Sequence, residues 1–106
     1  MDAALPDLLH KQLKALASPV RLRLLDWLKD PVTHFPPQVD GDLVTDGVCS
    51  VFVARKWEVT PASASRHLQM MTDAQLLIAT RKKGWTFYRR DEQTLAALRA
   101  RLSEEL

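Results

Sequence analysis

The sequence predicts a mainly helical domain that carries one small β-hairpin, and three observations support this fold class. Leucines recur at three- and four-residue spacing near both ends of the chain, which is the period of one helix face. A capping residue precedes a helix-like segment at Ser18, Thr60 and Asp91, and at the first two of these Pro comes next. Two runs of β-forming residues flank a Gly-containing turn at residues 81–84.

Length and composition indicate a single domain spanning residues 1–106. A chain of this size buries a small core, and oligomerisation is a common way to complete it. The single cysteine, Cys49, excludes an intrachain disulfide and suits a reducing cytoplasm. No secretion signal or bilayer-length apolar run is visible, so we expect a cytoplasmic protein without a membrane partner.

Two helices are predicted to open the chain, at residues 7–16 and 19–28. Ser18 and Pro19 suit the N-cap and first position of the second helix, and Pro31 ends it. The apolar positions on one stripe of the first helix are Leu8, Leu9, Leu13 and Leu16, and those expected to face the core from the second are Val20, Leu24, Leu25, Trp27 and Leu28.

Residues 31–48 form an inserted segment of a different kind, rich in Pro, Gly and Asp. We expect an ordered but irregular loop, because it contains apolar side chains to bury; disorder is the competing interpretation. Long irregular loops inside compact domains are often functional. The apolar residues in question are Val32, Phe35, Val39, Leu43 and Val44.

The second half of the chain predicts helix, turn, helix, hairpin and helix. A short helix covers residues 49–57, with Val51, Val53 and Ala54 toward the core. Residues 58–71 form a turn and a further helix, capped by Thr60 and Pro61. The hairpin occupies residues 76–90, where Gly84 supplies a positive φ for a tight turn. After Asp91, a last helix carries a stripe of leucines at Leu95, Leu98, Leu102 and Leu106.

Charge is distributed unevenly although the net charge is only +2. Residues 55–90 contain eight Lys or Arg and two acids, whereas residues 30–46 contain four Asp and no Lys or Arg. A basic block on the helix after Thr60 and on the hairpin is what attraction to nucleic-acid phosphates requires. An ordinary solvated basic face is the alternative interpretation.

The helix after Thr60 has the side chains that a DNA major groove admits. Its first turns hold small or hydrogen-bonding residues, so the backbone can approach the bases closely. A helix–turn–helix followed by a hairpin is a winged helix, whose hairpin reaches the flanking backbone. Ordinary helix surface is the alternative for Ser63 and Ser65, and packing or capping is the alternative for His67. The residues predicted to contact DNA are Thr60, Pro61, Ala62, Ser63, Ser65, Arg66, His67 and Gln69 on the helix and Arg81, Lys82 and Lys83 on the wing.

Three ordered motifs resemble the ArsR/SmtB family of winged-helix transcriptional regulators. They are Leu16-Ala-Ser-Pro-Val-Arg-Leu-Arg-Leu-Leu25, Thr60-Pro-Ala-Ser-Ala-Ser-Arg-His-Leu68 and Arg81-Lys-Lys-Gly-Trp-Thr-Phe-Tyr-Arg89. The resemblance implies a homodimeric repressor that binds a pseudo-palindromic operator in double-stranded DNA. It also implies dimerisation through the first and last helices, with interface residues Leu5, Leu8, Leu9, Leu13, Leu95, Leu98 and Leu102.

Many members of this family sense metals, but the familiar ligand sets are incomplete here. The Cys-x-Cys pair survives only as Cys49, because Val51 takes the second position, and the last helix has no His. Residues near the inserted loop remain candidates for nickel or zinc as an effector, and no metal is required for the fold. These candidates are His34, Asp40, Asp42 and Cys49, which Asp46 and His10 could join.

Other interpretations of the effector stay open at this stage. The loop aspartates resemble turn caps, and Cys49 reads as a buried apolar residue or a redox switch. An organic ligand held by the loop and Trp27 or Trp57 is an alternative to a metal, and a regulator without an effector, controlled by its own concentration, is another.

An enzyme is not expected, because the chain has neither a phosphate-binding glycine loop nor a Cys–His pair with an orienting acid. The rival function is a winged-helix protein-interaction module or a co-regulator. A protein partner or co-regulator would then dock first on residues 31–48.

Overall fold

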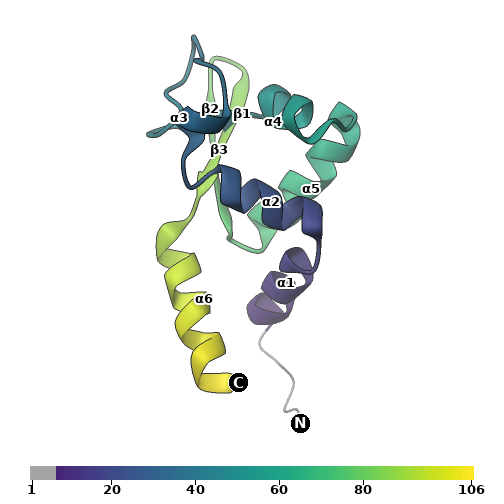
Figure 1. The fold of residues 1–106 in the computed structure, drawn as a ribbon, viewed down its shortest axis with the longest axis vertical. Helices are drawn as coiled ribbons and strands as arrows, with labels where there is room; N and C mark the ends of the chain where they lie inside the picture. Colours follow the sequence, from purple (N-terminus) through teal and green to yellow (C-terminus); the bar gives the residue numbers. More distant parts are fainter. Residues whose placement is uncertain (1–6) are drawn as a thin grey trace.

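The computed structural model describes residues 7–106, which form six helices and a three-stranded antiparallel sheet (Figure 1). The elements are α1 Asp7–Leu16, α2 Pro19–Trp27, α3 Pro31–His34, β1 Val48–Cys49, α4 Ser50–Trp57, α5 Pro61–Asp73, β2 Leu77–Lys82, β3 Trp85–Arg90 and α6 Glu92–Glu105. The sheet, α4 and the inserted loop lie at one end of the molecule, and α1 and α6 project toward the other end.

The three predicted N-caps are confirmed. The side chains of Ser18, Thr60 and Asp91 each accept a hydrogen bond from the backbone N–H three residues later. Such a cap typically stabilises a helix by about 1 kcal/mol, so these residues define where α2, α5 and α6 begin. Between α4 and α5 the chain turns at Glu58, which adopts the left-handed conformation with φ 58°.

The wing is a two-residue hairpin. Strands β2 and β3 pair from Leu77↔Arg90 to Lys82↔Trp85, which leaves only Lys83 and Gly84 in the turn. Both turn residues have positive φ, 51° and 82°, as a primed hairpin turn requires. The expectation for Gly84 is therefore confirmed, and the turn brings the basic residues of the wing to its tip.

Two short elements depart from the predicted organisation. Residues 31–34 form the helix α3 inside the segment that was expected to be irregular, with Pro31 at its first position. Cys49 belongs to strand β1 rather than to the following helix, which begins at Ser50. Strand β1 exists because Val48 and Cys49 pair with Tyr88 and Phe87 of β3. A strand of two residues has no sequence pattern of its own from which this long-range pairing could be predicted.

The rest of the inserted segment is ordered by its contacts with the sheet. The Gln38 amide donates to the carbonyl oxygens of Gly41 and Gly47 and accepts from the Cys49 N–H. Gly47 has φ 109° and lies so close to the backbone of Tyr88 that a Cβ would be 2.3 Å from its carbonyl oxygen. The loop is therefore held against β1 and β3.

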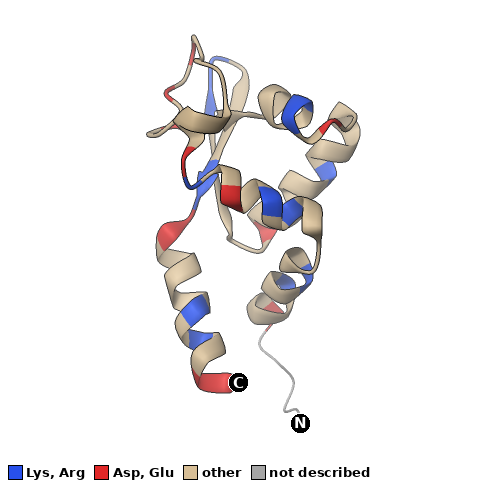
Figure 2. Ribbon diagram, viewed as in Figure 1, with Lys and Arg blue, Asp and Glu red and all other residues tan. Residues whose placement is uncertain are grey.

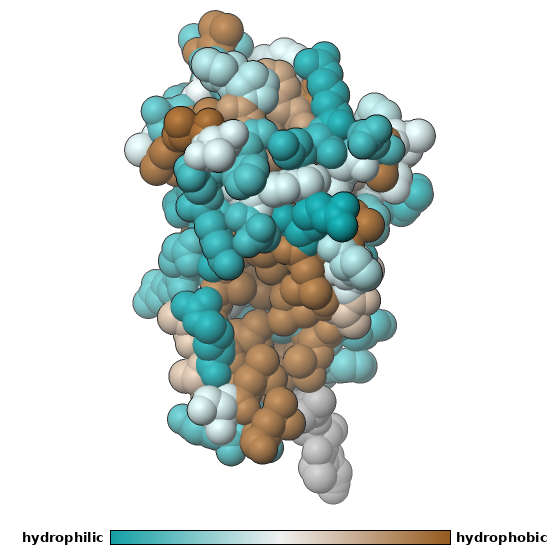
Figure 3. Space-filling view, viewed as in Figure 1, coloured by the Kyte–Doolittle hydropathy of each residue, from teal (hydrophilic) through white to brown (hydrophobic). Residues whose placement is uncertain are grey.

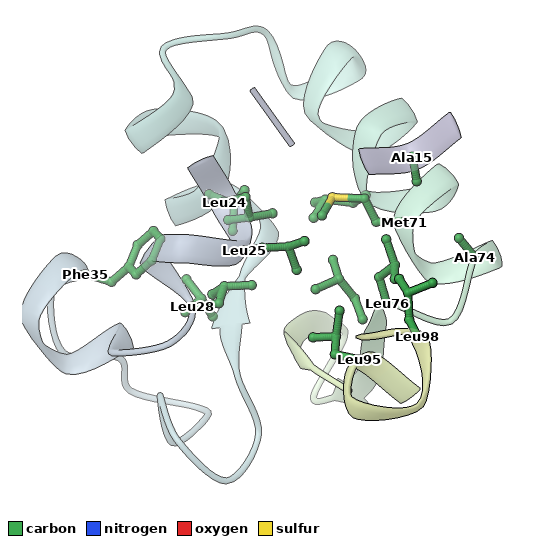
Figure 4. Packing of buried hydrophobic residues seen from close by; sticks show 14 of the residues in the cluster. Ala15, Leu24, Leu25, Leu28, Phe35, Met71, Ala74, Leu76, Leu95 and Leu98 are labelled. Carbon is green, nitrogen blue, oxygen red and sulfur yellow. The ribbon is translucent and has the colours of Figure 1, made fainter. Parts of the chain in front are cut away.

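A single apolar cluster joins the helices to the sheet (Figure 4). Its fully buried members include Leu24 of α2, Leu68 and Met71 of α5, Leu76, and Val48 of β1. Of the apolar loop residues, Phe35 is buried and Leu43 packs partly against the cluster. The core prediction is wrong for four other residues: Val51, Val32, Val39 and Val44 are exposed. The loop is held against the sheet by the polar contacts of Gln38 instead.

Candidate nucleic-acid interface

Helix α5 has one buried face and one exposed face along its whole length. Ala64, Leu68 and Met71 are buried against the core. The exposed residues follow helical spacing, so they form a single stripe that faces solvent. This stripe consists of Pro61, Ala62, Ser65, Arg66, Gln69, Met70 and Asp73.

The N-terminal part of this stripe carries small side chains. Ala62 and Ser65 are exposed, and Ser63 is half-buried with its N–H bound to the Thr60 hydroxyl. Arg66 is the first long side chain on the stripe. The helix can therefore approach another molecule closely near Ser65, while the Arg66 guanidinium can reach acceptor groups on either side.

His67 makes its contacts inside the protein. Its Nδ1 lies 3.0 Å from the Arg21 guanidinium, and its ring packs on Trp57 with the centroids 5.3 Å apart. A guanidinium can only donate, so His67 is the acceptor and is neutral in this arrangement. Burial, together with the positive charges of Arg21 and Arg66, lowers the pKa of His67 below its ordinary value of 6.5. The bond attaches α5 to α2.

Arg21 also binds the C-terminal end of α1. Its guanidinium donates to the carbonyl oxygens of Ala15 at 2.7 Å and Lys14 at 3.2 Å. One side chain of α2 therefore connects α1 and α5, a positioning role that sequence analysis missed. The sequence does not show these contacts, because His67 lies 46 residues after Arg21, and Ala15 and Lys14 lie six and seven residues before it.

The basic residues of the wing are exposed but engaged by the inserted loop. Lys82 Nζ lies 3.1 Å from the Asp46 carboxylate, and Lys83 Nζ lies 3.8 Å from the Asp40 carboxylate. Figure 2 shows these acidic loop positions beside the basic hairpin. Arg81 donates only to the Thr86 hydroxyl, at 3.5 Å. The loop therefore neutralises part of the charge that the sequence assigns to the wing.

The wing and the start of α5 border the same concave surface. A cavity of about 630 Å³ lies between them, with Pro61 and Ser65 on one side and Thr86 and Tyr88 on the other. A rod-shaped partner that contacts α5 at this point can therefore reach the wing as well.

The polar end of α5 faces α1 across a second groove, of about 380 Å³. Arg66, Gln69, Met70 and Asp73 line one wall, and Lys11 and Lys14 of α1 line the other. Gln69 donates to the Asp73 carboxylate at 2.8 Å, so the predicted DNA contact at Gln69 would compete with an existing bond. The two lysines were not among the predicted interface residues, because nothing in the sequence places α1 beside α5.

The leucines of α1 and α6 divide into two groups. Leu9, Leu95 and Leu98 are buried in the protomer's own core. Leu8, Leu13 and Leu102 are only partly covered, and Figure 3 shows apolar surface gathered between α1 and α6. Leu5 lies outside the described residues. The partly covered leucines are thus the ones that a second molecule can bury.

The candidate metal ligands are spread over several elements and have other contacts. Asp42 accepts from the N–H groups of Val44 and Thr45, which lowers its pKa. Asp46 accepts hydrogen bonds from the Asp42 N–H and from Lys82. Both bonds lower the pKa of Asp46, and the bond from the Asp42 N–H has the larger effect. His34 ends α3, and Cys49 is buried in β1. Within residues 7–106, no three His, Cys, Asp or Glu side chains come together in a way that could hold a metal ion.

No helix of the described chain is long and apolar enough to cross a bilayer. The order of elements, with α4 and α5 as a helix–turn–helix and β2–β3 as the following hairpin, defines a winged helix-turn-helix domain.

Comparisons with known proteins identify the family. No protein-family model matches the chain. An uncharacterised HTH-type transcriptional regulator of Bacillus subtilis, YbzH, is 38% identical over 93 residues, covering 88% of this chain and 93% of the relative. The crystal structure of an ArsR-family regulator superposes with a TM-score of 0.69 at 17% identity, covering 97% of this chain and 91% of the other.

A third similar protein is the winged helix-turn-helix domain of a possible ArsR-family regulator from Mycobacterium bovis, which is homodimeric in solution. It has a TM-score of 0.63 at 23% identity and covers 97% of this chain and 87% of its own. The chain belongs to the HTH-type transcriptional regulators, and its fold is that of the ArsR-family winged helix-turn-helix domains. It is a regulator of transcription and not an enzyme.

Proposed function

We propose that the protein is a homodimeric, sequence-specific repressor that binds a pseudo-palindromic operator through α5 and the wing. The observation that carries this proposal is the exposed stripe of α5, which begins with small residues and leads to Ser65 and Arg66. Such a helix fits the major groove, where serine and arginine can bond to base edges. The wing then lies next to the flanking backbone across the shared concave surface.

Dimerisation is supported by the apolar surface between α1 and α6. Leu8, Leu13 and Leu102 leave part of their side chains uncovered in one protomer. Leu8 also lines a groove that it shares with Ala97 and Leu98 of α6. Pairing across a two-fold axis would bury this surface and place two α5 helices on one face of the duplex. The homodimeric state of the similar domain from Mycobacterium bovis is consistent with this arrangement.

Repression would result from occupancy of the operator and requires no catalytic step. A dimer that covers an operator excludes other proteins from the same stretch of DNA, and the family resemblance favours this direction of control. We do not assign nickel or zinc to the inserted loop, because its carboxylates already bind backbone N–H groups and lysines.

The first experiment is DNA selection with the purified protein from a random-sequence pool, followed by binding to the selected duplex and to the region upstream of its own gene. We expect an enriched motif with two related half-sites. Ser65→Ala should weaken the preference for one position in each half-site, with Ser103→Ala, at an exposed position of α6 away from α5, as the matched control. Failure to enrich any sequence would contradict the proposal and favour a protein-interaction module or co-regulator.

The dimer is tested separately by sedimentation. Leu13→Gln together with Leu102→Gln should shift the protein toward the monomer and weaken binding to the two-half-site duplex more than to a single half-site. Val39→Gln is the matched control, because Val39 is 99% exposed on the inserted loop. A variant that remains dimeric would contradict the assignment of the interface to α1 and α6.

A further inference from the structure

A basic groove between α1 and α5 continues the exposed stripe of the reading helix. Lys11 and Lys14 stand on one wall and Arg66 on the other, and all three side chains are exposed. The two helices pack against each other, so the groove is built by the fold and not by a flexible tail. Figure 2 shows the basic positions on both helices.

The charge in this groove is available to a partner. Within residues 7–106, no carboxylate lies within ion-pair distance of Lys11, Lys14 or Arg66. The one acid on the groove, Asp73, already accepts a hydrogen bond from Gln69. Three cations therefore face one engaged carboxylate, whereas Lys82 and Lys83 of the wing each have a carboxylate partner.

The dimensions of DNA place this groove over the sugar–phosphate backbone. The major groove is about 12 Å wide, and a helix with its side chains is about 10–12 Å across, so α5 would fill it. An element packed directly on the side of α5 then lies over the phosphates that edge the groove. Helix α1 is such an element, and Lys11 and Lys14 are the residues that it presents beside Arg66.

We propose that Lys11 and Lys14 of α1 bind backbone phosphates beside the major groove that α5 occupies, and extend the DNA contact beyond the helix–turn–helix and the wing. The inference rests on the proposed DNA-binding function. Phosphate contacts fix the position of a protein on the duplex but carry no sequence information themselves. The two lysines therefore contribute affinity and orient α5, while the choice of sequence stays with the exposed residues near its N-terminus.

The test uses the whole protein and a duplex selected by the wild type from a random-sequence pool. Binding is measured over a series of salt concentrations for Lys11→Gln, Lys14→Gln and the double variant. Each lost phosphate contact should reduce the slope of log affinity against log salt by about 0.9 per protomer, with the sequence preference unchanged. Lys29→Gln is the matched control, because Lys29 is exposed and paired with Asp26 away from the groove.

A second variant separates charge from structure. Lys11→Arg with Lys14→Arg keeps both charges and should retain the wild-type slope. The groove assignment would be overturned if the double Gln variant binds the selected duplex with the wild-type salt slope. The proposed function would still stand in that case, provided that Arg66→Ala weakens binding to the same duplex. If the wild type selects no sequence, both proposals fall together.

Discussion

The wing and the α1–α5 groove are both basic, but they differ in how much of their charge is free to meet DNA. In the wing, Lys82 and Lys83 lie against Asp46 and Asp40 of the inserted loop. In the groove, Lys11 and Lys14 have no acidic partner among the described residues. The number of basic residues in an element is therefore a poor measure of its electrostatic attraction, because neighbouring acids already occupy some of them.

The inserted loop thus has a physical consequence for the proposed DNA contact. The DNA phosphates must compete with Asp40 and Asp46 for the lysines of the wing. When DNA binds, either these ion pairs break or the two carboxylates stay close to the phosphates and repel them. Solvent screens ion pairs near the surface, so each contributes little free energy; the competition therefore reduces affinity by a modest factor and does not prevent binding.

The largest effect is expected at Arg66, which belongs both to the reading stripe and to the groove. Arg66→Ala should cost about 1–3 kcal/mol of binding free energy, or roughly 5- to 150-fold in affinity. Competition between the selected duplex and single-base variants measures it. Gln69→Ala is the comparison, and its effect should be smaller because Gln69 is bound to Asp73. Equal losses for the two variants would contradict the special position of Arg66.

A smaller effect of opposite sign is expected when the wing is released from the loop. Asp40→Asn with Asp46→Asn removes both negative charges but keeps an oxygen that can accept the Asp42 N–H. DNA affinity should rise by up to about fivefold, and the salt slope should steepen. Asp26→Asn, which frees the exposed Lys29, serves as the control. No change in the slope would mean that the wing lysines already leave the loop freely.

A change in stability with pH is expected from the bond between Arg21 and His67. The pKa of His67 is lowered in the folded protein, so its stabilising contribution is present above the unfolded value of 6.5 and is lost as the pH falls below it. Urea unfolding at neutral pH and at pH values below 6.5 measures the loss. His67→Gln should show a weaker pH dependence over this window. An equally steep dependence in that variant would point to a different titrating group.

The smallest effect is expected from metal ions. Stoichiometric nickel or zinc should leave DNA affinity unchanged, because tight sites need three or four ligands and the loop carboxylates are engaged elsewhere. Binding titrations with metal-free and metal-loaded protein measure this. A rise in DNA affinity would show that a cation can bind Asp40 and Asp46 and release the wing lysines. Metal binding would then control how much of the charge of the wing is available to DNA.

The winged-helix fold, most of the helices and the hairpin could be predicted because local rules determine them. Ser18, Thr60 and Asp91 act on N–H groups three residues away, and the turn at Lys83–Gly84 depends on two adjacent φ angles. The stripe on α5 follows from helical spacing alone. The predicted DNA-contacting residues remain a prediction, although His67 and Gln69 already have partners inside the protein.

Contacts between distant segments could not be predicted in this way. Strand β1 forms only because β3 is beside it, and Cys49 was placed in a helix for lack of that information. The lysine groove exists only because α1 packs on α5, and the masking of the wing joins Lys82 to Asp46 across 36 residues.

The sequence by itself thus determined five of the six described helices, where the side-chain-capped ones begin, how the wing turns and that the domain is a winged helix-turn-helix. The tertiary structure decided which cations are free, which leucines remain uncovered and which side chains hold α5 in place. The physical reason is the distance along the chain over which each kind of interaction acts. Caps, turns and periodicity act within a few residues, whereas the availability of a charge or an apolar surface depends on what the fold places beside it.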